Sequence, residues 1–573
     1  MKNHYFILGF ILVSNVMAAQ VVFSNQALNA GIIATAGDTY LGNGISFCDY
    51  NNDGWDDITI ATQNNAPVLF FKNRNGTFEA DALNIPANTY QHKQVIWVDI
   101  DNDGDKDLFV TANNGPNKLY ENLGDLNFQD ISTAAGFSSE NLESYGASWG
   151  DYNNDGYLDL FLSNRSESNS QRNYFFRNNG NNTFTDVTEE AGFDLNSHMT
   201  FCAAFFDFNN DGWQDLYLSS DKYFNQNFLY QNNGDGTFTD VSVPSNTGII
   251  IDAMSTTIGD FNNDGWFDLY ITNTPADGNV LFRNNGDGTF TDLAVFSGTR
   301  LYSYAWGAVF LDADNDMDED LYVSCEFDGS NPPYQSSAFF QNRGNNTFAN
   351  NTQTAVSGDA AKSYANAVGD FNNDGLPDIA VSNINYENIY LWENQTTTSN
   401  NWLKVTLEGV ESNRDGIGSR IEISVNGLKQ YRYTISGEGY LSQNSSAEIF
   451  GLGNSSSIDY IRVTWLSGTV DYIENVAANQ SIHIQEGSNT LNAPQTPNWK
   501  VSFYPNPVKN KLVLNAPTPI TAVHVYTLLG QKVLETAAQN SQIAMDVSAL
   551  NTGVYMVKVF SKTAINTFQI IKE

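Results

Sequence analysis

The sequence predicts an all-β protein whose largest part is a seven-bladed β-propeller, and two repeated patterns underlie this prediction. A nine-residue acidic segment begins at Asp49, Asp99, Asp151, Asp207, Asp260, Asp312 and Asp370. Each copy is followed by an aromatic segment, an Asn-Gly type of turn, and a segment that opens on Thr-Phe or a close variant, which is typical of a hairpin. Four short strands in each unit of about 50 residues indicate the blades of a propeller.

The two ends of the repeat array favour a closed ring. Phe23 and Phe128 are each followed after seven residues by Ala-Gly, whereas the seventh repeat stops after Asn394 without such a final segment. We therefore expect the chain from Val21 onward to pair into the last blade, which removes exposed strand edges. The predicted propeller runs from 20 to 396.

The acidic segments predict calcium sites. Each has Asp at positions 1, 5 and 9, Asn or Asp at position 3, and a backbone carbonyl available at position 7. Oxygen ligands at alternate residues suit Ca²⁺, which takes roughly six to eight of them. Glycine at position 6 indicates a turn with positive φ, and only the sixth copy departs from it, with Met317. One acidic turn alone is weak evidence for a calcium site. The prediction of about seven sites, one per blade, therefore depends on the recurrence of seven copies in phase.

The predicted calcium ligands, which include the position-7 residues through their carbonyls, are Asp49, Asn51, Asp53, Trp55, Asp57, Asp99, Asp101, Asp103, Asp105, Asp107, Asp151, Asn153, Asp155, Tyr157, Asp159, Asp207, Asn209, Asp211, Trp213, Asp215, Asp260, Asn262, Asp264, Trp266, Asp268, Asp312, Asp314, Asp316, Asp318, Asp320, Asp370, Asn372, Asp374, Leu376 and Asp378.

Composition and the N-terminal residues indicate an exported protein. The formal net charge of −38 argues against nucleic acid and anionic membranes as partners. Residues 1–19 have the basic start, apolar run and small residues of a secretory signal peptide, and no later run is apolar enough to span a membrane. The cysteines Cys48, Cys202 and Cys325 are expected to be buried free thiols, with one disulfide and one leftover thiol as the alternative.

Two smaller β domains are predicted behind the propeller. Residues 397–487 change to alternating segments such as Tyr460–Trp465, and contain Gly437-Glu-Gly-Tyr-Leu-Ser-Gln443. A linker covers 488–500. Residues 501–573 open on Val501-Ser-Phe-Tyr-Pro-Asn-Pro507 and continue as alternating strands, which predicts an immunoglobulin-like β-sandwich.

Each part resembles a known family. The repeats resemble the FG-GAP/VCBS family, best known from integrin α propellers. Residues 397–487 look like the ASPIC/UnbV module of cartilage acidic protein relatives, although Ile449 and Leu466 replace a frequent His and Pro. Residues 501–573 resemble the type A sorting domain of type IX secretion. This resemblance implies a partner, the type IX secretion machinery, and a location outside the cell or on the outer membrane surface.

No catalytic motif stands out in the sequence: we find no Ser-His-Asp order, Cys-His pair, zinc signature or phosphate loop. The polar clusters around Arg414, Asp415 and Glu438 are expected to fix turns. In a propeller, the loops that enter the innermost strands surround the channel mouth opposite the calcium loops; here they carry Tyr40, Tyr90, His92, Lys93, Tyr145, His198, Arg300, Tyr302, Tyr304, Lys362 and Tyr364.

Two hypotheses about function follow. The first is a secreted or surface-bound adhesion protein that recognises a glycan or protein ligand with this mouth. The alternative is a calcium-dependent polysaccharide lyase, or a related carbohydrate enzyme, with His92, His198 and Tyr304 as acid or base candidates. Calcium is the only cofactor that the sequence predicts.

Overall fold

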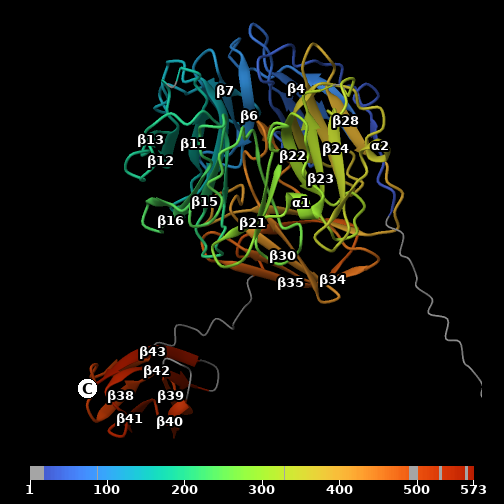
Figure 1. Ribbon diagram of the computed structural model, residues 1–573. Coiled ribbons are helices and arrows are strands. Elements are labelled where there is room, and N and C mark those ends of the chain that lie inside the picture. Colours follow the sequence, from blue (N-terminus) through green and yellow to red (C-terminus); the bar gives the residue numbers. More distant parts are fainter. Residues whose placement is uncertain are drawn as a thin grey trace, which may run out of the picture. The chain divides into compact units, whose positions relative to one another are not determined.

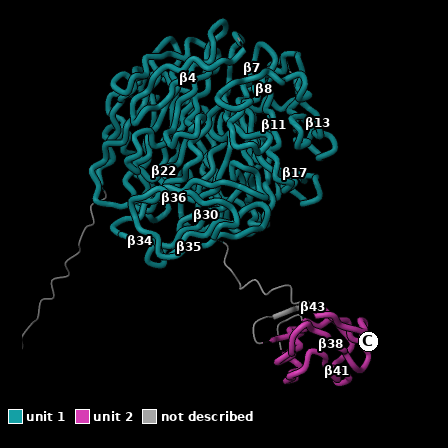
Figure 2. Tube along the Cα trace, turned by 180° about the vertical axis from the view of Figure 1, so that it is seen from behind, with its two compact units in different colours: residues 1–490 teal, residues 491–573 magenta. Residues whose placement is uncertain are grey.

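The computed structural model describes residues 19–86, 88–168, 170–327, 329–489, 501–527, 532–561 and 565–573. The predicted signal peptide, apart from Ala19, and most of the predicted linker lie outside them. The chain forms two compact units, 1–490 and 491–573 (Figure 2). The first unit contains both the predicted propeller and the predicted small β domain, so the boundary at 396/397 stays a prediction.

The repeats form seven antiparallel sheets. The first sheet consists of β2 (Ile45–Cys48), β3 (Asp57–Ile60), β4 (Leu69–Asn73) and β5 (Phe78–Asp81). The second consists of β6 (His92–Val98), β7 (Asp107–Ala112), β8 (Lys118–Asn122) and β9 (Phe128–Asp130). The third consists of β10 (Ser144–Gly150), β11 (Asp159–Asn164), β12 (Tyr174–Asn178) and β13 (Phe184–Asp186). The fourth sheet consists of β14 (Thr200–Phe206), β15 (Asp215–Ser220), β16 (Phe228–Asn232) and β17 (Phe238–Asp240). The fifth consists of β18 (Thr256–Gly259), β19 (Asp268–Ile271), β20 (Val280–Asn284) and β21 (Phe290–Asp292). The sixth consists of β22 (Ala305–Leu311), β23 (Asp320–Cys325), β24 (Ser337–Asn342) and β25 (Phe348–Asn350).

The last sheet joins the two ends of the repeat array. It consists of β26 (Ser363–Gly369), β27 (Asp378–Asn383), β28 (Tyr390–Asn394) and the N-terminal β1 (Phe23–Asn25). Phe23 pairs with Asn394 in antiparallel register, as the sequence predicted. Two one-turn helices, α1 (Ala294–Ser297) and α2 (Thr352–Ala355), lie in the connections that follow β21 and β25. The prediction of an all-β protein with four-stranded antiparallel repeat sheets is confirmed, and this arrangement is consistent with propeller blades.

Apolar side chains from neighbouring sheets pack against one another. The inner strands are buried along their whole length, as in β7 and β10. One cluster joins Phe109 of the second sheet to Trp149 and Leu160 of the third. Cys48, Cys202 and Cys325 are buried free thiols, as expected. Within the described residues no helix is long and apolar enough to cross a membrane.

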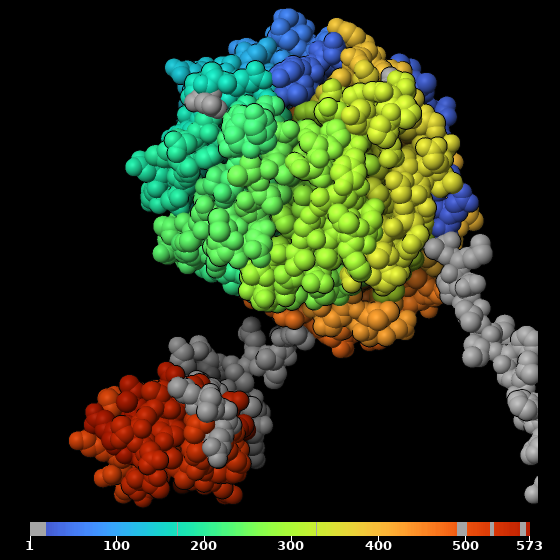
Figure 3. All heavy atoms as spheres, viewed as in Figure 1, coloured from blue at the N-terminus to red at the C-terminus, as the bar shows by residue number. Residues whose placement is uncertain are grey.

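Residues 402–486 form a module of two sheets beneath the repeats (Figure 1). Its strands are β29 (Trp402–Glu408), β30 (Arg420–Val425), β31 (Leu428–Tyr433), β33 (Glu448–Gly451), β34 (Ser457–Thr464), β35 (Val470–Ala477) and β36 (Gln480–Gln485). The module has its own core, which includes Val405, Ile423 and Trp465. Its orange surface lies directly against the green and yellow surface of the repeats in Figure 3.

One segment of the module, residues 436–445, runs between the innermost strands of the repeat sheets; we call it the channel segment. Its strand β32 (Ser442–Gln443) pairs with β2 in parallel. The N–H of Trp149 donates to Ser436 O (2.9 Å), and the N–H of Gly439 donates to Thr256 O (2.8 Å). A Cβ on Gly437 would lie 2.2 Å from Ala147 O, so only glycine fits there. The channel segment therefore ties several repeats together.

Aromatic rings fill the space around the channel segment. Tyr440 is fully buried, and its ring centroid lies 4.9 Å from that of Trp306 and 5.5 Å from that of Phe201. Its hydroxyl donates to Leu41 O at 2.7 Å. The space between the innermost strands of the repeat sheets is consequently a packed core.

The second unit has two sheets around one core. Their strands are β37 (Ser502–Tyr504), β38 (Lys511–Asn515), β39 (Ala522–Thr527), β40 (Lys532–Ala537), β41 (Gln542–Asp546), β42 (Gly553–Phe560) and β43 (Ile565–Lys572).

Candidate metal centres and the opposite face

Each acidic loop connects the first and second strands of its sheet and closes on its position-1 carboxylate. In all seven loops this carboxylate accepts the N–H groups of positions 5 and 6. Asp260, for example, accepts from Asp264 at 3.0 Å and from Gly265 at 2.8 Å. Gly265 has φ 84°, and Met317 has the same conformation, with φ 86°. The sixth loop therefore keeps its turn, at a cost of about 1–2 kcal/mol for a side chain in the left-handed region.

The position-9 aspartates are buried in every loop. One carboxylate oxygen of each accepts the backbone N–H of the Asn that ends the third strand, at 2.7–2.8 Å. Burial raises the pKa of Asp57 to about 8 and that of Asp107 to about 9. A buried carboxylate costs free energy unless it is protonated or neutralised by a cation.

The loops bring oxygen ligands together. Asp99, Asp101 and Asp107 place carboxylate oxygens within 4.8 Å of one another, and so do the first three aspartates of the sixth loop, Asp312, Asp314 and Asp316. Among the described carboxylate oxygens of the acidic loops, Asp268 Oδ2 and Asp314 Oδ1 are buried without a hydrogen-bond partner. These donors are all oxygen, so the residues fit a hard cation such as Ca²⁺.

Position 3 is Asn in the other five loops, where its amide binds a carboxylate of the same loop. Asn153 Nδ2, for example, donates to Asp155 Oδ2 at 2.8 Å, and Asn51 Nδ2 donates to Asp57 Oδ2. The position-7 residues donate their N–H to the position-5 carboxylate, as Trp213 does to Asp211 at 2.9 Å. The full ligand set predicted from the sequence thus lies in the loops, and its role in binding Ca²⁺ is taken up as a proposal below.

Position 4, to which the sequence analysis assigned no role, is Asn in all seven loops and links each loop to the next. These residues are left-handed, with φ 54–64°. Each Nδ2 donates to the position-6 carbonyl of the following loop at 2.8–3.2 Å, and Asn373 donates back to Gly54 O of the first loop at 3.1 Å. The donors are Asn52, Asn102, Asn154, Asn210, Asn263, Asn315 and Asn373. Asn tolerates positive φ, and its recurrence at position 4 of all seven loops was the sequence signal that could have pointed to this role.

The module covers the loops with polar contacts. Lys404 Nζ lies 2.6 Å from Asp370 Oδ2, and both side chains are buried. Arg420 Nη1 donates to Asn210 Oδ1 at 2.8 Å. Asp415, which we had expected only to fix a turn, forms an ion pair with Lys106 and accepts the N–H of Asp99 at 3.1 Å. These side chains bind the module to the repeats.

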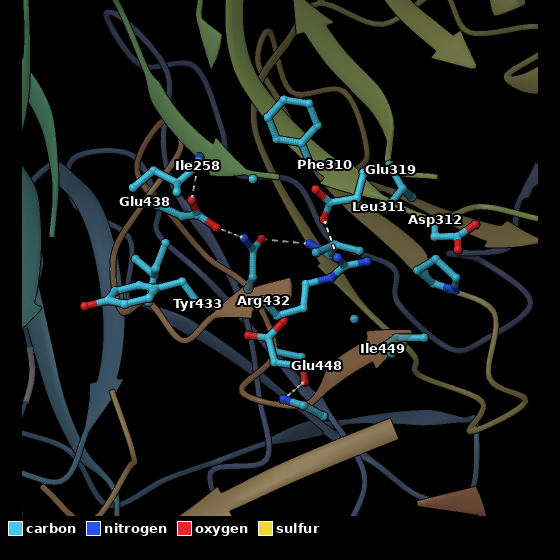
Figure 4. Close-up of a pocket in the computed structure, with 18 of the residues that line it drawn as sticks. Ile258, Phe310, Leu311, Asp312, Glu319, Arg432, Tyr433, Glu438, Glu448 and Ile449 are labelled. Carbon is cyan, nitrogen blue, oxygen red and sulfur yellow. Dashed lines mark hydrogen bonds and ion pairs between the residues drawn. The ribbon is translucent and has the colours of Figure 1, made fainter. Parts of the chain in front are cut away.

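An acidic cavity of about 90 Å³ lies where the module meets the repeats (Figure 4). Arg432 Nη1 lies 3.2 Å from Glu319 Oε1. Glu438 accepts from the Ile258 N–H at 3.2 Å and from Asn444 Nδ2 at 2.7 Å. Burial raises the pKa of Glu438 to about 7 and that of Glu448 to about 8. Glu438 thus anchors the channel segment.

The three catalytic candidates are held by different partners, and among the described side chains no hydrogen bond or ring contact joins them. His92 is completely buried; its Nδ1 lies 3.1 Å from Thr62 Oγ1, and burial lowers its pKa to about 4. His198 Nε2 lies 2.9 Å from Asp194 Oδ2. The ring centroid of Tyr304 lies 5.1 Å from that of Phe327.

The expected channel mouth is largely closed. His92, Lys93, Tyr145 and Tyr364 are buried, because the channel segment packs between the innermost strands of the repeat sheets. Lys93 Nζ donates to two backbone carbonyls, those of residues 40 and 42, and lies 4.9 Å from the Tyr145 ring centroid. The expectation that these four residues form an open ring is therefore corrected.

Exposed aromatic residues remain at the same end of the sheets. Tyr40 and Tyr302 stay exposed, as expected, and the loops between second and third strands add Tyr223, Phe224 and Tyr386, which the sequence analysis missed; all five are 53–75% exposed. We call these five residues the upper-face aromatics.

Three family models match the chain. The FG-GAP-like repeat model matches residues 49–110, 99–162, 158–218, 207–271, 260–323 and 329–381. The model "ASPIC and UnbV" matches 409–491, and the model of a secretion system C-terminal sorting domain matches 502–573.

Similar whole proteins are distant. Cartilage acidic protein 1 of Mus musculus is 27% identical over 346 residues, which cover 54% of this chain and 51% of that protein. The same protein of Homo sapiens is 27% identical, with 54% and 50% covered. The chain thus spans about half the length of these relatives. Among solved structures, PorZ, a surface component of the type IX secretion system of Porphyromonas gingivalis, is 12% identical, with 93% of this chain and 81% of that chain covered and a TM-score of 0.24.

Proposed function

Because this chain belongs to the FG-GAP-like repeat family, we propose that its repeats form a closed seven-bladed propeller that holds Ca²⁺ in its acidic loops and binds a glycan or protein ligand outside the cell. The ring of seven Asn-to-carbonyl hydrogen bonds supports closure, since its last member returns to the first loop. The buried position-9 carboxylates and the oxygen ligands around them support a structural cation.

Export of the protein rests on its C-terminal domain. The sorting domain at 502–573 indicates secretion to the cell surface or the exterior and interaction with the type IX secretion machinery. The ligand and the binding role are our proposal.

The upper-face aromatics are the observation that carries the binding role. In each repeat sheet, the acidic loop joins the first strand to the second, so the loops that hold these residues lie at the opposite ends of the strands. Exposed aromatic rings present an apolar face of the kind that stacks on sugar rings and anchors protein partners. The module contacts several of the acidic loops, through Asp415, Lys404 and Arg420, whereas the upper-face aromatics are exposed.

A glycan microarray probed with the calcium-loaded full chain tests this role. The triple variant Tyr40→Ala/Tyr302→Ala/Tyr386→Ala should lose at least about tenfold in affinity for any glycan that binds, with an unchanged melting temperature because these rings are exposed. Tyr504→Ala, an equally exposed tyrosine in the second unit, is the matched control. Undiminished binding by the triple variant would rule out the upper face.

The lyase alternative has less support. His92 is buried, and among the described side chains no hydrogen bond or ring contact joins it to His198 or Tyr304.

A further inference from the structure

The sixth acidic loop carries more negative charge than most of the others. It has Asp at all five odd-numbered positions, from Asp312 to Asp320, and only the second loop, from Asp99 to Asp107, shares this pattern. The other five loops have three carboxylates at these positions, with Asn at position 3 and an uncharged residue at position 7. Charge count is one of the factors that set the affinity of a Ca²⁺ loop. The second loop is therefore the closest comparison for the sixth.

The sixth loop differs from all the others in its burial. Its position-3 residue, Asp314, is 1% exposed, whereas position 3 is partly exposed in the other six loops. None of its five ligand residues, all of which the structure describes, is exposed. In each of the other loops the position-5 carboxylate is exposed; these residues are Asp53, Asp103, Asp155, Asp211, Asp264 and Asp374. An ion in the sixth loop would thus be enclosed where the other loops are open to solvent.

The carboxylates of the sixth loop converge. Oxygens of Asp312, Asp314 and Asp316 lie within 4.8 Å of one another. Gln341 Nε2 donates to Asp314 Oδ2 at 3.0 Å. Asp314 Oδ1 is buried without a hydrogen-bond partner among the described residues, and the group beside this side chain is a second carboxylate, that of Asp316. Two neighbouring carboxylates repel each other unless a proton or a cation lies between them, so this cluster points to a bound cation.

The module closes the sixth loop from outside. The N–H of Gly453 donates to Asn315 O at 2.9 Å. Gly451 lies directly against the position-1 carboxylate, because a Cβ there would be 2.0 Å from Asp312 Oδ2. The backbone of the module therefore packs on the loop that would hold the ion.

Met317 joins the sixth loop to the module. It stands where the other six loops have glycine, and its side chain packs against the core of the module. Its φ of 86° lies in the left-handed region, which is unfavourable for a residue with a side chain. The packing gives a physical reason for a residue that the turn itself disfavours.

We propose that the sixth loop holds an enclosed Ca²⁺ that the module locks in place, so that this ion exchanges only when the module moves away from the loop. The inference rests on the proposed binding of Ca²⁺ by the acidic loops. Met317 is a positioning residue in this arrangement, because its side chain acts through the module. By linkage, binding of this ion and docking of the module stabilise each other.

Isotope exchange at constant Ca²⁺ tests the proposal. The full chain is loaded with radioactive calcium, the bound label is measured by equilibrium dialysis, and excess unlabelled CaCl₂ is then added so that every site stays occupied. We expect one equivalent of label per chain to leave at least about tenfold more slowly than the rest, because its release requires local opening of the module contact.

Three variants assign the slow ion. Met317→Gly restores the glycine of the other loops and should leave the total unchanged while the slow equivalent joins the fast phase. Asp314→Ala should remove the slow equivalent. Asp101→Ala, at the same position of the second loop, is the matched control and should remove a fast equivalent while the slow phase remains. Met317→Gly decides the question if Asp314→Ala does not fold.

The possible failures are distinguishable. Loss of all the label in one fast phase from the folded wild-type chain would overturn this inference and leave Ca²⁺ binding by the loops intact. A slow phase that persists in Met317→Gly, or in folded Asp314→Ala, would also overturn it. Absence of bound label before the exchange would refute Ca²⁺ binding itself, and the inference with it.

Discussion

Removal of the cations from the acidic loops should make this protein less stable as the pH rises from 5 to 7. Burial raises the pKa of Asp57 to about 8 and that of Asp107 to about 9, from an ordinary value of 3.8. A carboxyl group with a raised folded-state pKa contributes its full stability below the unfolded-state pKa and loses it as the pH rises through the folded-state value. Without a cation, both groups therefore favour unfolding as they are driven to ionise.

The magnitude follows from the width of that window. Between its two pKa values, each group lowers the free energy of unfolding by about 1.4 kcal/mol per pH unit. Both groups are inside their windows from pH 5 to 7, so together they remove about 5 kcal/mol. This loss is comparable with the total stability of a typical domain, about 5–15 kcal/mol. The other buried position-9 aspartates, such as Asp215 and Asp378, shift in the same direction.

Circular dichroism melts of metal-free full chain across this pH range, with and without added CaCl₂, measure the effect. We expect the metal-free melting temperature to fall with pH, and the increase caused by Ca²⁺ to be larger at pH 7 than at pH 5. In the metal-free protein, Asp107→Asn should make the free energy of unfolding fall less steeply with pH, by about 1.4 kcal/mol per pH unit. Asp287→Asn, at an exposed position, should leave this pH dependence unchanged. A metal-free melting temperature that stays constant or rises would refute the reasoning, and so would a melt that Ca²⁺ leaves unchanged.

Three further perturbations address other parts of the molecule. Asn373→Ala removes the hydrogen bond that closes the ring of loops and should lower the free energy of unfolding by about 1 kcal/mol in urea; the same loss in Asn285→Ala, on an exposed hairpin, would show that the ring adds nothing special. Tyr440→Ala empties the middle of the channel and should cost about 3–5 kcal/mol, against no change for Tyr504→Ala. A chain that ends at residue 490 lacks the sorting domain and should stay inside the cell in fractionation and immunoblotting; its appearance at the surface would contradict the assignment of export to that domain.

The repeated patterns predicted the strands well because each depends on local chemistry. The acidic loops and the hairpins recur in phase, so the four strands of each repeat and the pairing of β1 with β28 followed directly. The spacing of the ligands predicted a role for the position-9 aspartates in binding calcium, whereas their burial was not predicted. Position 4 was overlooked because its Asn side chain acts between loops, and a pattern read within one loop does not include its neighbour.

The channel segment could not be predicted from local patterns. The glycine-flanked cluster at Glu438 was expected only to fix a turn. Nothing in the order of residues 436–445 specifies contact with Trp149 or Thr256, which lie far earlier in the chain. For the same reason the burial of His92 and Tyr145 was missed. Long-range packing decided the accessibility of these candidates.

The channel segment also has a consequence for the order of folding. Ser442 and Gln443 pair with Ile45 and Ser46, so the first repeat gains its last inner neighbour only after almost 400 further residues have been made. The ring cannot be completed first and filled afterwards without opening a path to its centre. Ring closure and insertion of the segment should therefore occur as one late, cooperative step, and slow refolding of the 1–490 unit is the expected mark of this topology.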